Sequence, residues 1–215
     1  MLVVLPARNE PDEISLFLIN LPMEGVFTKK IDILGRRILG LHNAGVGEVR
    51  ISAENCLGGL GKGGEILQVG LNKHVLLSSA GYVGNAQTAV NDALEYAKQR
   101  HQFGRPIGNF QAIGHMLANM QTEVDASRLL VYFAASRMEQ GEDCMQDVSM
   151  AKYFASETYV NVSNQGMHIM GGNGYMKEYD MQRYARDARI ATTESHSSWY
   201  HLNMIAKGLG LKVNS

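Results

Sequence analysis

The pattern of hydrophobic and polar positions changes near residue 65. Before that point, short apolar runs at residues 2–5 and 14–19 lie between turn-forming residues. Val49 and Ile51 alternate with polar neighbours, a spacing typical of a half-buried strand. A glycine-rich loop over residues 58–64 follows. This first part of the chain is therefore predicted to consist mainly of short β-strands.

After residue 65, apolar residues recur every three or four positions, which predicts helices. We expect three long helices over about residues 65–99, 110–139 and 146–170, and a fourth over about residues 197–209. The clearest hydrophobic seam belongs to the second helix and comprises Phe110, Ile113, Leu117, Met120, Val124, Ser127, Val131, Ala134 and Met138. Gly141 follows in the C′ position, where glycine commonly ends a helix. Long helices with short links predict an antiparallel four-helix bundle.

Two glycines, Gly81 and Gly84, lie inside the first predicted helix. Each costs roughly 1 kcal/mol relative to alanine in a helix interior. We therefore expect another helix to pack closely against this part of the first one.

The charge balance restricts the possible partners. The chain has 215 residues, with 20 Lys and Arg, 21 Asp and Glu, and a formal net charge of -1. No excess of basic residues is available to neutralise nucleic-acid phosphates, and nothing favours binding to an anionic membrane. Charged residues make up only 19%, which is low for a fully hydrated surface. Together with the apolar seam, this predicts an oligomer.

The chain carries no sign of secretion or of a membrane span. No stretch approaches the roughly 20 apolar residues of a spanning helix, and residues 1–6 lack the basic region of a signal peptide. Cys56 and Cys144 match neither a disulfide framework nor a metal-binding spacing. We expect a reduced, intracellular compartment and no metal site.

Three polar segments stand out against the helical pattern. Residues 100–107 read Arg-His-Gln-Phe-Gly-Arg-Pro-Ile, residues 170–175 read Met-Gly-Gly-Asn-Gly-Tyr, and residues 183–189 read Arg-Tyr-Ala-Arg-Asp-Ala-Arg. A glycine-rich turn at a helix end allows the backbone to approach a nucleotide closely. A nearby arginine can hold a pyrophosphate through paired N–H donors. Each segment alone is a weak signal.

In this order and spacing, the three segments resemble the C-terminal bundle of the acyl-CoA dehydrogenases. Residues 93–100, 117–128 and 151–156 resemble three of its successive helices, and the strand segments between residues 14 and 54 resemble the second half of its middle β-domain. The resemblance implies an α+β chain, with a partial middle β-domain over residues 1–64 and a four-helix bundle over residues 65–215. The bundle would serve FAD binding and oligomerisation.

The resemblance also implies an activity. Members of this family oxidise acyl-CoA thioesters between Cα and Cβ in fatty-acid metabolism. A carboxylate removes the α-proton, FAD accepts the β-hydride, and an electron-transfer flavoprotein or similar acceptor reoxidises the flavin. The expected assembly is a homo-oligomer, a dimer or a tetramer, with FAD at the subunit interface. The expected compartment is the cytoplasm, or the mitochondrial matrix of a eukaryote.

Cofactor-binding residues follow by position in the family's motifs. In the Arg-x-x-Phe-Gly segment they are Arg100, Gln102 and Phe103, which would reach the FAD of a neighbouring subunit. In the family's Gln-x-x-Gly-Gly segment, which touches the other end of the cofactor, they are His168, Gly171 and Gly172. In its later Glu-Gly-Thr segment the residue is Ser197. His168 replaces the glutamine and could still donate a hydrogen bond.

The catalytic base is where this sequence departs most from the family. Ser195 takes the place of the usual glutamate, and Glu194 lies one residue earlier. Some relatives carry the base on the first long helix, where this chain has His74. The neighbouring Asp and Arg that help hold the thioester are replaced by Asn72 and Val75. Glu194 is the leading candidate base and His74 the alternative.

The beginning of the chain leaves more than one role open. The family's helical N-terminal domain and its flavin-facing Trp-Ile-Thr strand would lie before Met1. The chain is therefore interpreted as a truncated or weakly active flavoprotein, with turnover near background when isolated. The alternative is a catalytically silent subunit that completes the FAD site of a full-length partner.

Overall fold

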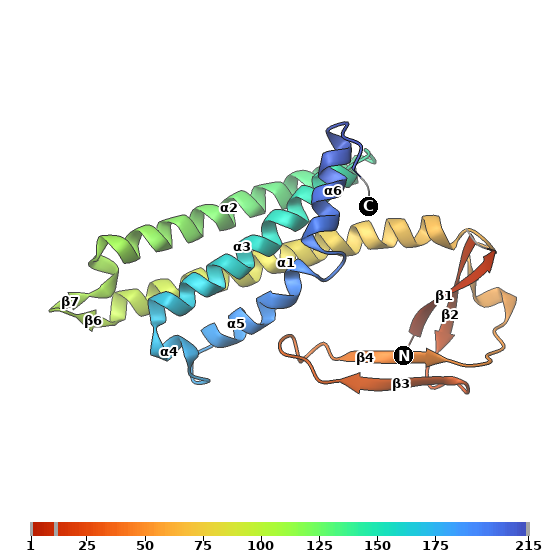
Figure 1. Cartoon of the computed structure of the whole chain (residues 1–215), viewed down its shortest axis with the longest axis horizontal. Helices are drawn as coiled ribbons and strands as arrows, with labels where there is room; N and C mark the ends of the chain where they lie inside the picture. The colour runs from red at the N-terminus through yellow and green to blue at the C-terminus, as the bar shows by residue number, and fades with distance from the viewer. Residues whose placement is uncertain (1, 11–12, 214–215) are drawn as a thin grey trace. The chain divides into compact units, whose positions relative to one another are not determined.

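The computed structural model describes residues 2–10 and 13–213. It divides into two compact units, Met1–Lys73 and His74–Ser215, which we term the β unit and the helical unit. Antiparallel strand pairs dominate the first and helices dominate the second (Figure 1). The α+β fold class is thereby confirmed.

A three-stranded antiparallel sheet contains both strands that the apolar runs predicted. β1 (Leu2–Glu10) pairs with β2 (Glu13–Asn20), and β2 pairs with the short strand β5 (Cys56–Leu57). Leu16 and Ile19 of β2 are buried together with Ser15, whose hydroxyl accepts a hydrogen bond from the backbone N–H of Gly61 at 2.9 Å. The Ser15 contact fixes the glycine-rich loop against β2.

The second sheet was missed in the sequence. β3 (Val26–Ile31) and β4 (Leu41–Val46) form an antiparallel pair from Val26 opposite Val46 to Ile31 opposite Leu41. Most of their side chains are exposed, so they show no apolar alternation.

The strand predicted around Val49 and Ile51 is wrong: these side chains are half-buried and their neighbours exposed, but the segment joins no strand of the described chain. An unpaired extended segment has the same alternation as a strand. A 3₁₀ turn, η1 (Ala53–Asn55), follows it.

The first helix begins where glycine allows its backbone to touch the sheet. α1 (Gly63–Gln99) starts two residues before the predicted position. A β-carbon on Gly63 would lie 2.7 Å from the carbonyl oxygen of Ile14 and 2.9 Å from the backbone nitrogen of Leu16. Both distances are shorter than any side chain tolerates, which explains why glycine is needed at this position.

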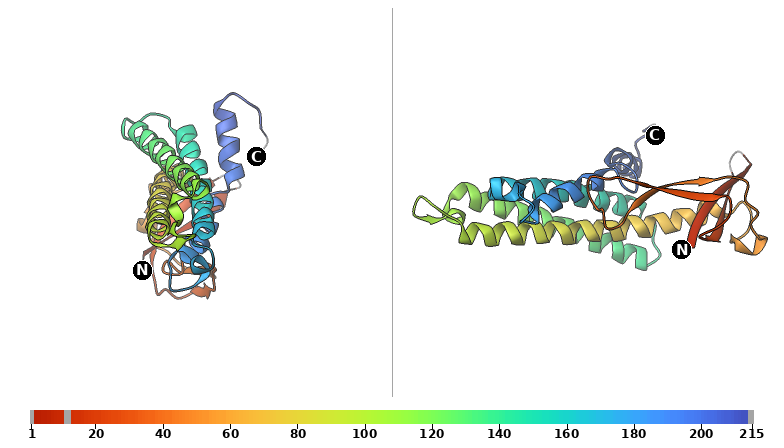
Figure 2. Two further views of the ribbon diagram at one scale, coloured as in Figure 1. Left: turned by 90° about the vertical axis from the view of Figure 1, so that its left-hand side faces the viewer. Right: turned by 90° about the horizontal axis from the view of Figure 1, so that it is seen from below.

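In the helical unit, as far as residue 213, the chain passes through five helices of eight residues or more. They are α1, which continues from the β unit, α2 (Gln111–Glu139), α3 (Met145–Met170), α5 (Met181–Ala188) and α6 (Ser198–Gly208) (Figures 1 and 2). The connecting elements are β6 (His101–Gln102), β7 (Arg105–Pro106), η2 (Ile107–Asn109), α4 (Gly172–Tyr175) and η3 (Arg189–Thr192). The four predicted helices are all present, with boundaries within two residues of the prediction.

The apolar seam of α2 packs inside the chain. Met120, Val124 and Val131 are buried in the core formed with α1, α3 and α5, and Ile113, Leu117 and Met138 pack against the edge of that core. The seam therefore gives no reason to expect a partner, and that part of the argument for an oligomer was wrong. A different face of α2 exposes large apolar side chains, namely those of Leu129, Tyr132 and Phe133.

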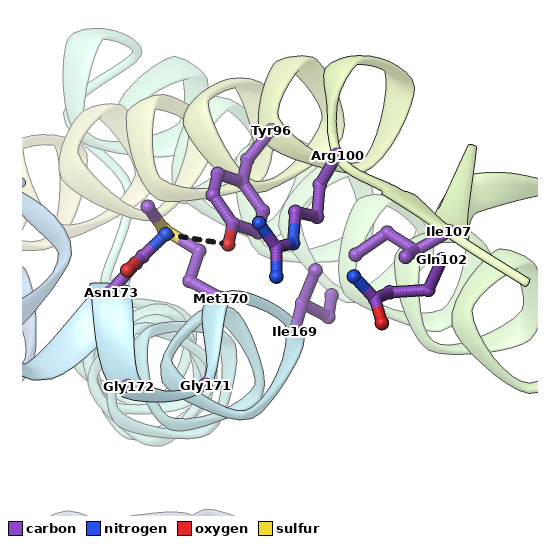
Figure 3. A pocket seen from close by; sticks show the side chains of 9 residues that line it. All are labelled: Tyr96, Arg100, Gln102, Ile107, Ile169, Met170, Gly171, Gly172 and Asn173. Carbon is purple, nitrogen blue, oxygen red and sulfur yellow. Dashed lines mark hydrogen bonds between the residues drawn. The ribbon is translucent and has the colours of Figure 1, made fainter. Parts of the chain in front are cut away.

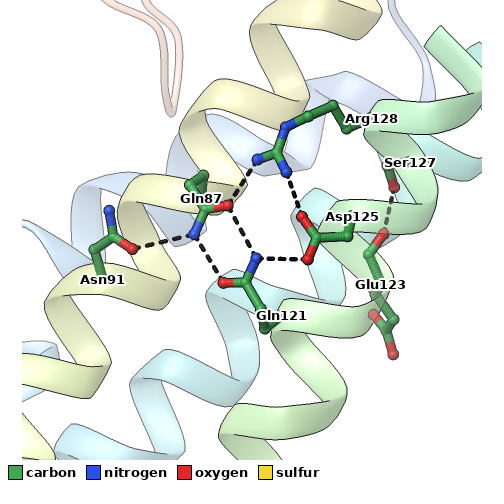
Figure 4. Close-up of polar contacts among 7 residues, drawn as sticks. All are labelled: Gln87, Asn91, Gln121, Glu123, Asp125, Ser127 and Arg128. Atoms are coloured by element: carbon green, nitrogen blue, oxygen red, sulfur yellow. Dashed lines mark hydrogen bonds and ion pairs between the residues drawn. The ribbon is translucent and has the colours of Figure 1, made fainter. Parts of the chain in front are cut away.

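A polar network ties α1 to α2. Gln87 and Gln121 exchange amide hydrogen bonds of 2.9 and 3.2 Å, and Arg128 donates to Gln87 at 2.7 Å while it pairs with Asp125 (Figure 4). Asn91 accepts a further bond from Gln87 at 3.1 Å. A reciprocal amide pair satisfies both side chains only when the two residues face each other, so this network fixes the register of the two helices.

Helix α5 was missed because its segment was interpreted only as an arginine cluster. Met181, Tyr184 and Ala188 are spaced by three and four and are buried in the core. The Tyr184 hydroxyl donates to Asp92 Oδ2 at 2.8 Å. Burial, followed by this bond to a carboxylate, raises the pKa of Tyr184 to about 12. Arg183 and Arg186 lie on the other side of this short helix, and Arg189 begins η3.

The glycines of the long helices serve different purposes. Gly141 has φ +73°, its N–H donates to Met138 O, and the N–H of Glu142 donates to Arg137 O, which together form a Schellman motif. The prediction for Gly141 is confirmed. The close helix contact expected at Gly81 and Gly84 is wrong within this chain, because a β-carbon on either would have nothing within 4 Å.

We expect opposite stability changes from alanine at two of these glycines. Gly84→Ala should raise the free energy of unfolding by about 0.5–1 kcal/mol, because the helix interior gains propensity and meets no obstacle. Gly141→Ala should lower it by about 1 kcal/mol, because alanine is strained at positive φ. Urea denaturation of the two variants tests the pair, and a stabilising Gly141→Ala would contradict the assigned helix end.

Candidate functional site

A cavity of about 320 Å³ lies beside the C-terminal ends of α1 and α3. It is lined by Tyr96, Arg100, Gln102, Ile107, Ile169, Met170, Gly171, Gly172 and Asn173 (Figure 3). Two of the polar segments recognised in the sequence, about 70 residues apart, thus meet at one place. Four predicted cofactor-binding residues, Arg100, Gln102, Gly171 and Gly172, are among the lining residues.

The turn after α1 positions Arg100 and Gln102 at the cavity. The Arg100 N–H still donates to Tyr96 O at 2.8 Å, and the Arg100 carbonyl accepts from the N–H of Ile107 at 2.8 Å. Between them, β6 and β7 reverse the chain through Phe103 and Gly104, which have φ angles of +52° and +79°. The side chains of Arg100 and Gln102 therefore lie at the same side of the cavity (Figure 3).

The glycine pair forms another wall of the cavity. Gly171 ends α3 with φ +57° and ψ −134°, a conformation that essentially only glycine adopts. A β-carbon on Gly171 or Gly172 would have nothing within 4 Å, so the backbone itself borders open space. Asn173 donates to the Tyr96 hydroxyl at 2.8 Å and ties this turn to α1.

These groups are suited to bind an anion. Arg100 carries a permanent positive charge, and no hydrogen bond or ion pair engages its guanidinium within the described ranges, 2–10 and 13–213. A guanidinium and an amide beside exposed backbone match the paired oxygens of a pyrophosphate. The donor set therefore fits the pyrophosphate of FAD, the cofactor that the sequence resemblance implies.

Three other predicted cofactor residues lie outside the cavity. Phe103 is 92% exposed at the tip of the turn, with its ring edge-on to Phe110. His168 is exposed on the last turn of α3. Ser197 is the N-cap of α6, where its hydroxyl accepts from the N–H of Tyr200 at 3.3 Å. Their roles toward a cofactor stay predictions.

The two candidate bases occupy different environments. Glu194 is half-buried after η3, and its Oε2 accepts a hydrogen bond from the Tyr82 hydroxyl at 3.0 Å. His74 is exposed on α1, about 12 Å along the helix axis from Tyr82. Val75 is buried in the core, where it cannot contact a thioester. Only Glu194 of the two candidates thus has a partner that orients it, within the hydrogen bonds of the described chain.

The loop that carries Glu194 is strained and firmly anchored. Ser195 and His196 have φ angles of +54° and +73°, which non-glycine residues rarely adopt. The buried Lys152 ammonium donates to Ala191 O at 2.6 Å. Burial lowers the pKa of Lys152 to about 8, although the charges of Glu194 and Glu157 oppose that change.

A buried histidine forms the second anchor of this loop. His201 Nε2 lies 3.0 Å from Ser195 O, and its Nδ1 lies 3.3 Å from Ser149 Oγ. Because a carbonyl can only accept, we assign the proton to Nε2, which leaves Nδ1 to accept from the Ser149 hydroxyl. Burial lowers the pKa of His201 to about 4, so the ring is neutral at pH 7.

The sequence reasoning missed Tyr82, Lys152 and His201. One signal was available: Lys152 lies on the apolar face of α3, between Val148 and Ala155, where an unpaired lysine would be costly.

The Glu194 loop and the cavity are far apart in one chain, because Tyr82, which contacts the loop, and Tyr96, which lines the cavity, are separated by about 21 Å along α1. One chain therefore presents two separate surfaces, the cavity and the Glu194 loop.

Within residues 2–10 and 13–213, no helix is both long and apolar enough to cross a bilayer.

The sequence profile of the acyl-CoA dehydrogenase C-terminal domain matches residues 61–210. The chain is 39% identical over 197 residues to 3-(aryl)acrylate reductase of Clostridium sporogenes, covering 91% of this chain and 52% of that protein. It is 36% identical to a subunit of the caffeyl-CoA reductase–Etf complex of Acetobacterium woodii, covering 93% of this chain and 52% of the relative.

Solved structures agree with these sequence matches. Butyryl-CoA dehydrogenase from Megasphaera elsdenii superposes with a TM-score of 0.93 at 32% identity, over 98% of this chain and 56% of that one. The chain spans about half the length of the curated relatives it matches. The matched profile covers more than half of its residues, including the cavity and the Glu194 loop. The chain belongs to the acyl-CoA dehydrogenase family.

Proposed function

We propose that this chain binds FAD and takes part in the α,β-oxidation of an acyl-CoA thioester. One observation carries the proposal: Arg100, Gln102, Gly171 and Gly172 meet at a single cavity suited to a pyrophosphate. When bound, FAD would supply the acceptor for the β-hydride. The arginine and the amide would hold the cofactor, and the open glycine backbone would allow its close approach.

We propose Glu194 as the group that removes the α-proton. Its carboxylate is held by the Tyr82 hydroxyl, whereas the alternative, His74, is exposed and has no such partner among the hydrogen bonds of the described chain. A general base must be within hydrogen-bond reach of its proton, and an oriented carboxylate meets that demand better than a mobile side chain.

The relatives support finer proposals for substrate and acceptor. Two of them are named for arylacrylate and caffeyl-CoA reduction, and the second is part of a complex with Etf. A 3-arylpropanoyl thioester or a short acyl-CoA is the proposed substrate, and an electron-transfer flavoprotein the proposed acceptor. Purified chain loaded with FAD can be mixed with butyryl-CoA and with 3-phenylpropanoyl-CoA, and bleaching of the flavin band then reports oxidation.

Arg100→Ala is expected to weaken FAD binding by about 10–150-fold. A lost hydrogen-bonded contact to a charged group costs roughly 1.5–3 kcal/mol. Quenching of flavin fluorescence measures the affinity at two salt concentrations, and the variant should also lose part of the salt dependence. Arg105→Ala is the matched control, because Arg105 lies on the same turn but stacks on Phe110 at 4.1 Å, outside the cavity lining. Equal affinities of the wild type and Arg100→Ala would refute the assignment.

The second candidate function is a silent subunit that completes the FAD site of a full-length partner. It is favoured by Ser195, which takes the usual base position. A chain that stays colourless with added FAD, but gains flavin when mixed with a full-length homologue, would support this function against the first.

We also propose that the chain forms a homo-oligomer. Leu129, Tyr132 and Phe133 expose more than half of their side chains on one stretch of α2. Covering such a patch is favourable, since burial is worth about 25 cal/mol per Å². Tyr132→Glu should shift the sedimentation coefficient toward the monomer, and a wild-type chain that sediments as a monomer at micromolar concentration would contradict the proposal.

A further inference from the structure

The loop around Glu194 has a strained backbone conformation that must be stabilised by its surroundings. Two consecutive residues, Ser195 and His196, keep positive φ angles. Such residues cost on the order of 1–3 kcal/mol each and persist only where the surroundings determine the conformation. Contacts from other elements must therefore hold the loop.

We propose that Tyr82 and Lys152 are positioning residues, which hold the carboxylate of Glu194 and the backbone of its loop in the geometry needed for proton removal. The inference rests on the proposed function, because it takes Glu194 as the base. The resemblance assigned no role to either residue, although Lys152 lies within residues 151–156, which resemble one of the family's helices.

Tyr82 is a rigid donor. Its side chain is almost fully buried on α1, and its ring lies against that of Tyr159 on α3, with centroids 6.3 Å apart and planes 16° apart. Its hydroxyl reaches Glu194 Oε2 at 3.0 Å. A buried ring leaves few rotamers, so the hydroxyl is preorganised and the carboxylate takes its direction from α1 rather than from the loop.

Lys152 holds the same loop from the opposite helix. Its ammonium is fully buried, donates to Ala191 O at 2.6 Å, and lies 5.7 Å from the centre of the Tyr82 ring. The charges of Glu194 and Glu157 raise the pKa of Lys152 against the effect of burial, and the nearby His201 is neutral at pH 7. A buried cation needs such anionic neighbours, so Lys152 favours a loop conformation that keeps Glu194 close.

The two residues together account for the displaced base. The chain turns into the left-handed region at Ser195, immediately after Glu194. The carboxylate therefore lies before the turn, where the Tyr82 hydroxyl reaches it from α1, while Lys152 on α3 holds the backbone of the loop at Ala191. A serine at the usual base position is then compatible with proton removal, because the bundle re-aims the preceding residue.

Amide hydrogen exchange tests the role of Tyr82 without any cofactor. In Tyr82→Phe, the backbone amides of residues 190–197 should exchange about tenfold faster, because one hydrogen bond to a charged group is lost. Tyr175→Phe is the matched control: it makes the same change on an exposed side chain of α4 and should leave this segment as in the wild type. Unchanged exchange in Tyr82→Phe would overturn the assignment of Tyr82.

Titration of the Lys152 ammonium tests whether Lys152 is coupled to Glu194. Nuclear magnetic resonance of lysine side chains should give a Lys152 pKa in Glu194→Gln that is lower than in the wild type, because the Glu194 charge raises it. Ser195→Ala, which changes the next residue but no charge, should leave the Lys152 pKa unaltered. An equal pKa in the wild type and Glu194→Gln would show that the two groups are not coupled, and the proposal would fail.

A third measurement separates positioning from simple structural support. With FAD bound, exchange of the butyryl-CoA α-protons in D₂O should slow about tenfold in Tyr82→Phe, with an unchanged KM. A change in KM alone would indicate a structural role and overturn the proposal. If the chain takes up no FAD, the proposed function fails, and the first two experiments still decide whether Tyr82 and Lys152 hold Glu194.

Discussion

Glu194→Gln is expected to slow removal of the acyl-CoA α-proton by about 10²–10⁴-fold. Removal of a positioned general base has an effect of this size, because an amide cannot accept the proton. Glutamine keeps the shape of the side chain and its carbonyl oxygen can still accept from Tyr82, so the fold should be preserved. The measurement is deuterium incorporation into butyryl-CoA by the FAD-loaded chain at pH 7.

Two further variants make this result interpretable. Ser195→Ala should change the rate little, since the hydroxyl at the usual base position is not expected to take the proton. His74→Gln should likewise have a small effect. Full activity of Glu194→Gln combined with loss of activity in His74→Gln would move the base to α1. Background rates in the wild type as well would instead favour the silent-subunit role.

The helical part of the fold could be predicted because its signal is local. Spacings of three and four in α2 lie along one helix face, and that face is buried whatever it packs against. Gly141 could be predicted for the same reason, since a helix end needs only its own residues. What covers a face cannot be predicted from its pattern, and the seam of α2 was wrongly taken as a reason for an oligomer.

Four residues that line the cavity were predicted from the family resemblance and not from the pattern of hydrophobic and polar positions. Arg100 and Gly171 are far apart in sequence, and no periodicity shows that α1 and α3 end at the same place. The motifs assigned both residues to FAD, but to different ends of the cofactor, and the fold places them at one cavity. His168 and Ser197 were assigned by the same motifs, but they lie outside the cavity.

The anchors of the Glu194 loop could not be found in the sequence. The bonds from Tyr82 to Glu194, from Lys152 to Ala191 and from Ser149 to His201 join residues 112, 39 and 52 positions apart. In a sequence, a buried polar residue can be recognised only when it interrupts an otherwise apolar helix face. Its hydrogen-bond partner cannot be predicted from the sequence. Such contacts are created by packing, so only the structure supplies them.

The buried imidazole predicts that the helical unit is acid-sensitive. Lowering the pH from 7 to 4 should reduce its free energy of unfolding by about 3 kcal/mol through His201 alone. The folded chain keeps this ring neutral down to a pKa of about 4, whereas histidine in an unfolded chain takes up its proton near pH 6.5. Acid therefore favours the unfolded chain, and the stabilisation that is complete above pH 6.5 is lost as the pH falls toward 4.

His201→Gln isolates this contribution from that of the carboxylates. Glutamine does not titrate, and its amide can still donate to Ser195 O, so the variant should show a shallower loss of stability between pH 6.5 and 4. Urea denaturation at several pH values gives both curves, and their difference should grow to about 3 kcal/mol at pH 4. Parallel curves would mean that the pKa of His201 is the same in the folded and the unfolded chain, and would contradict the neutral buried ring.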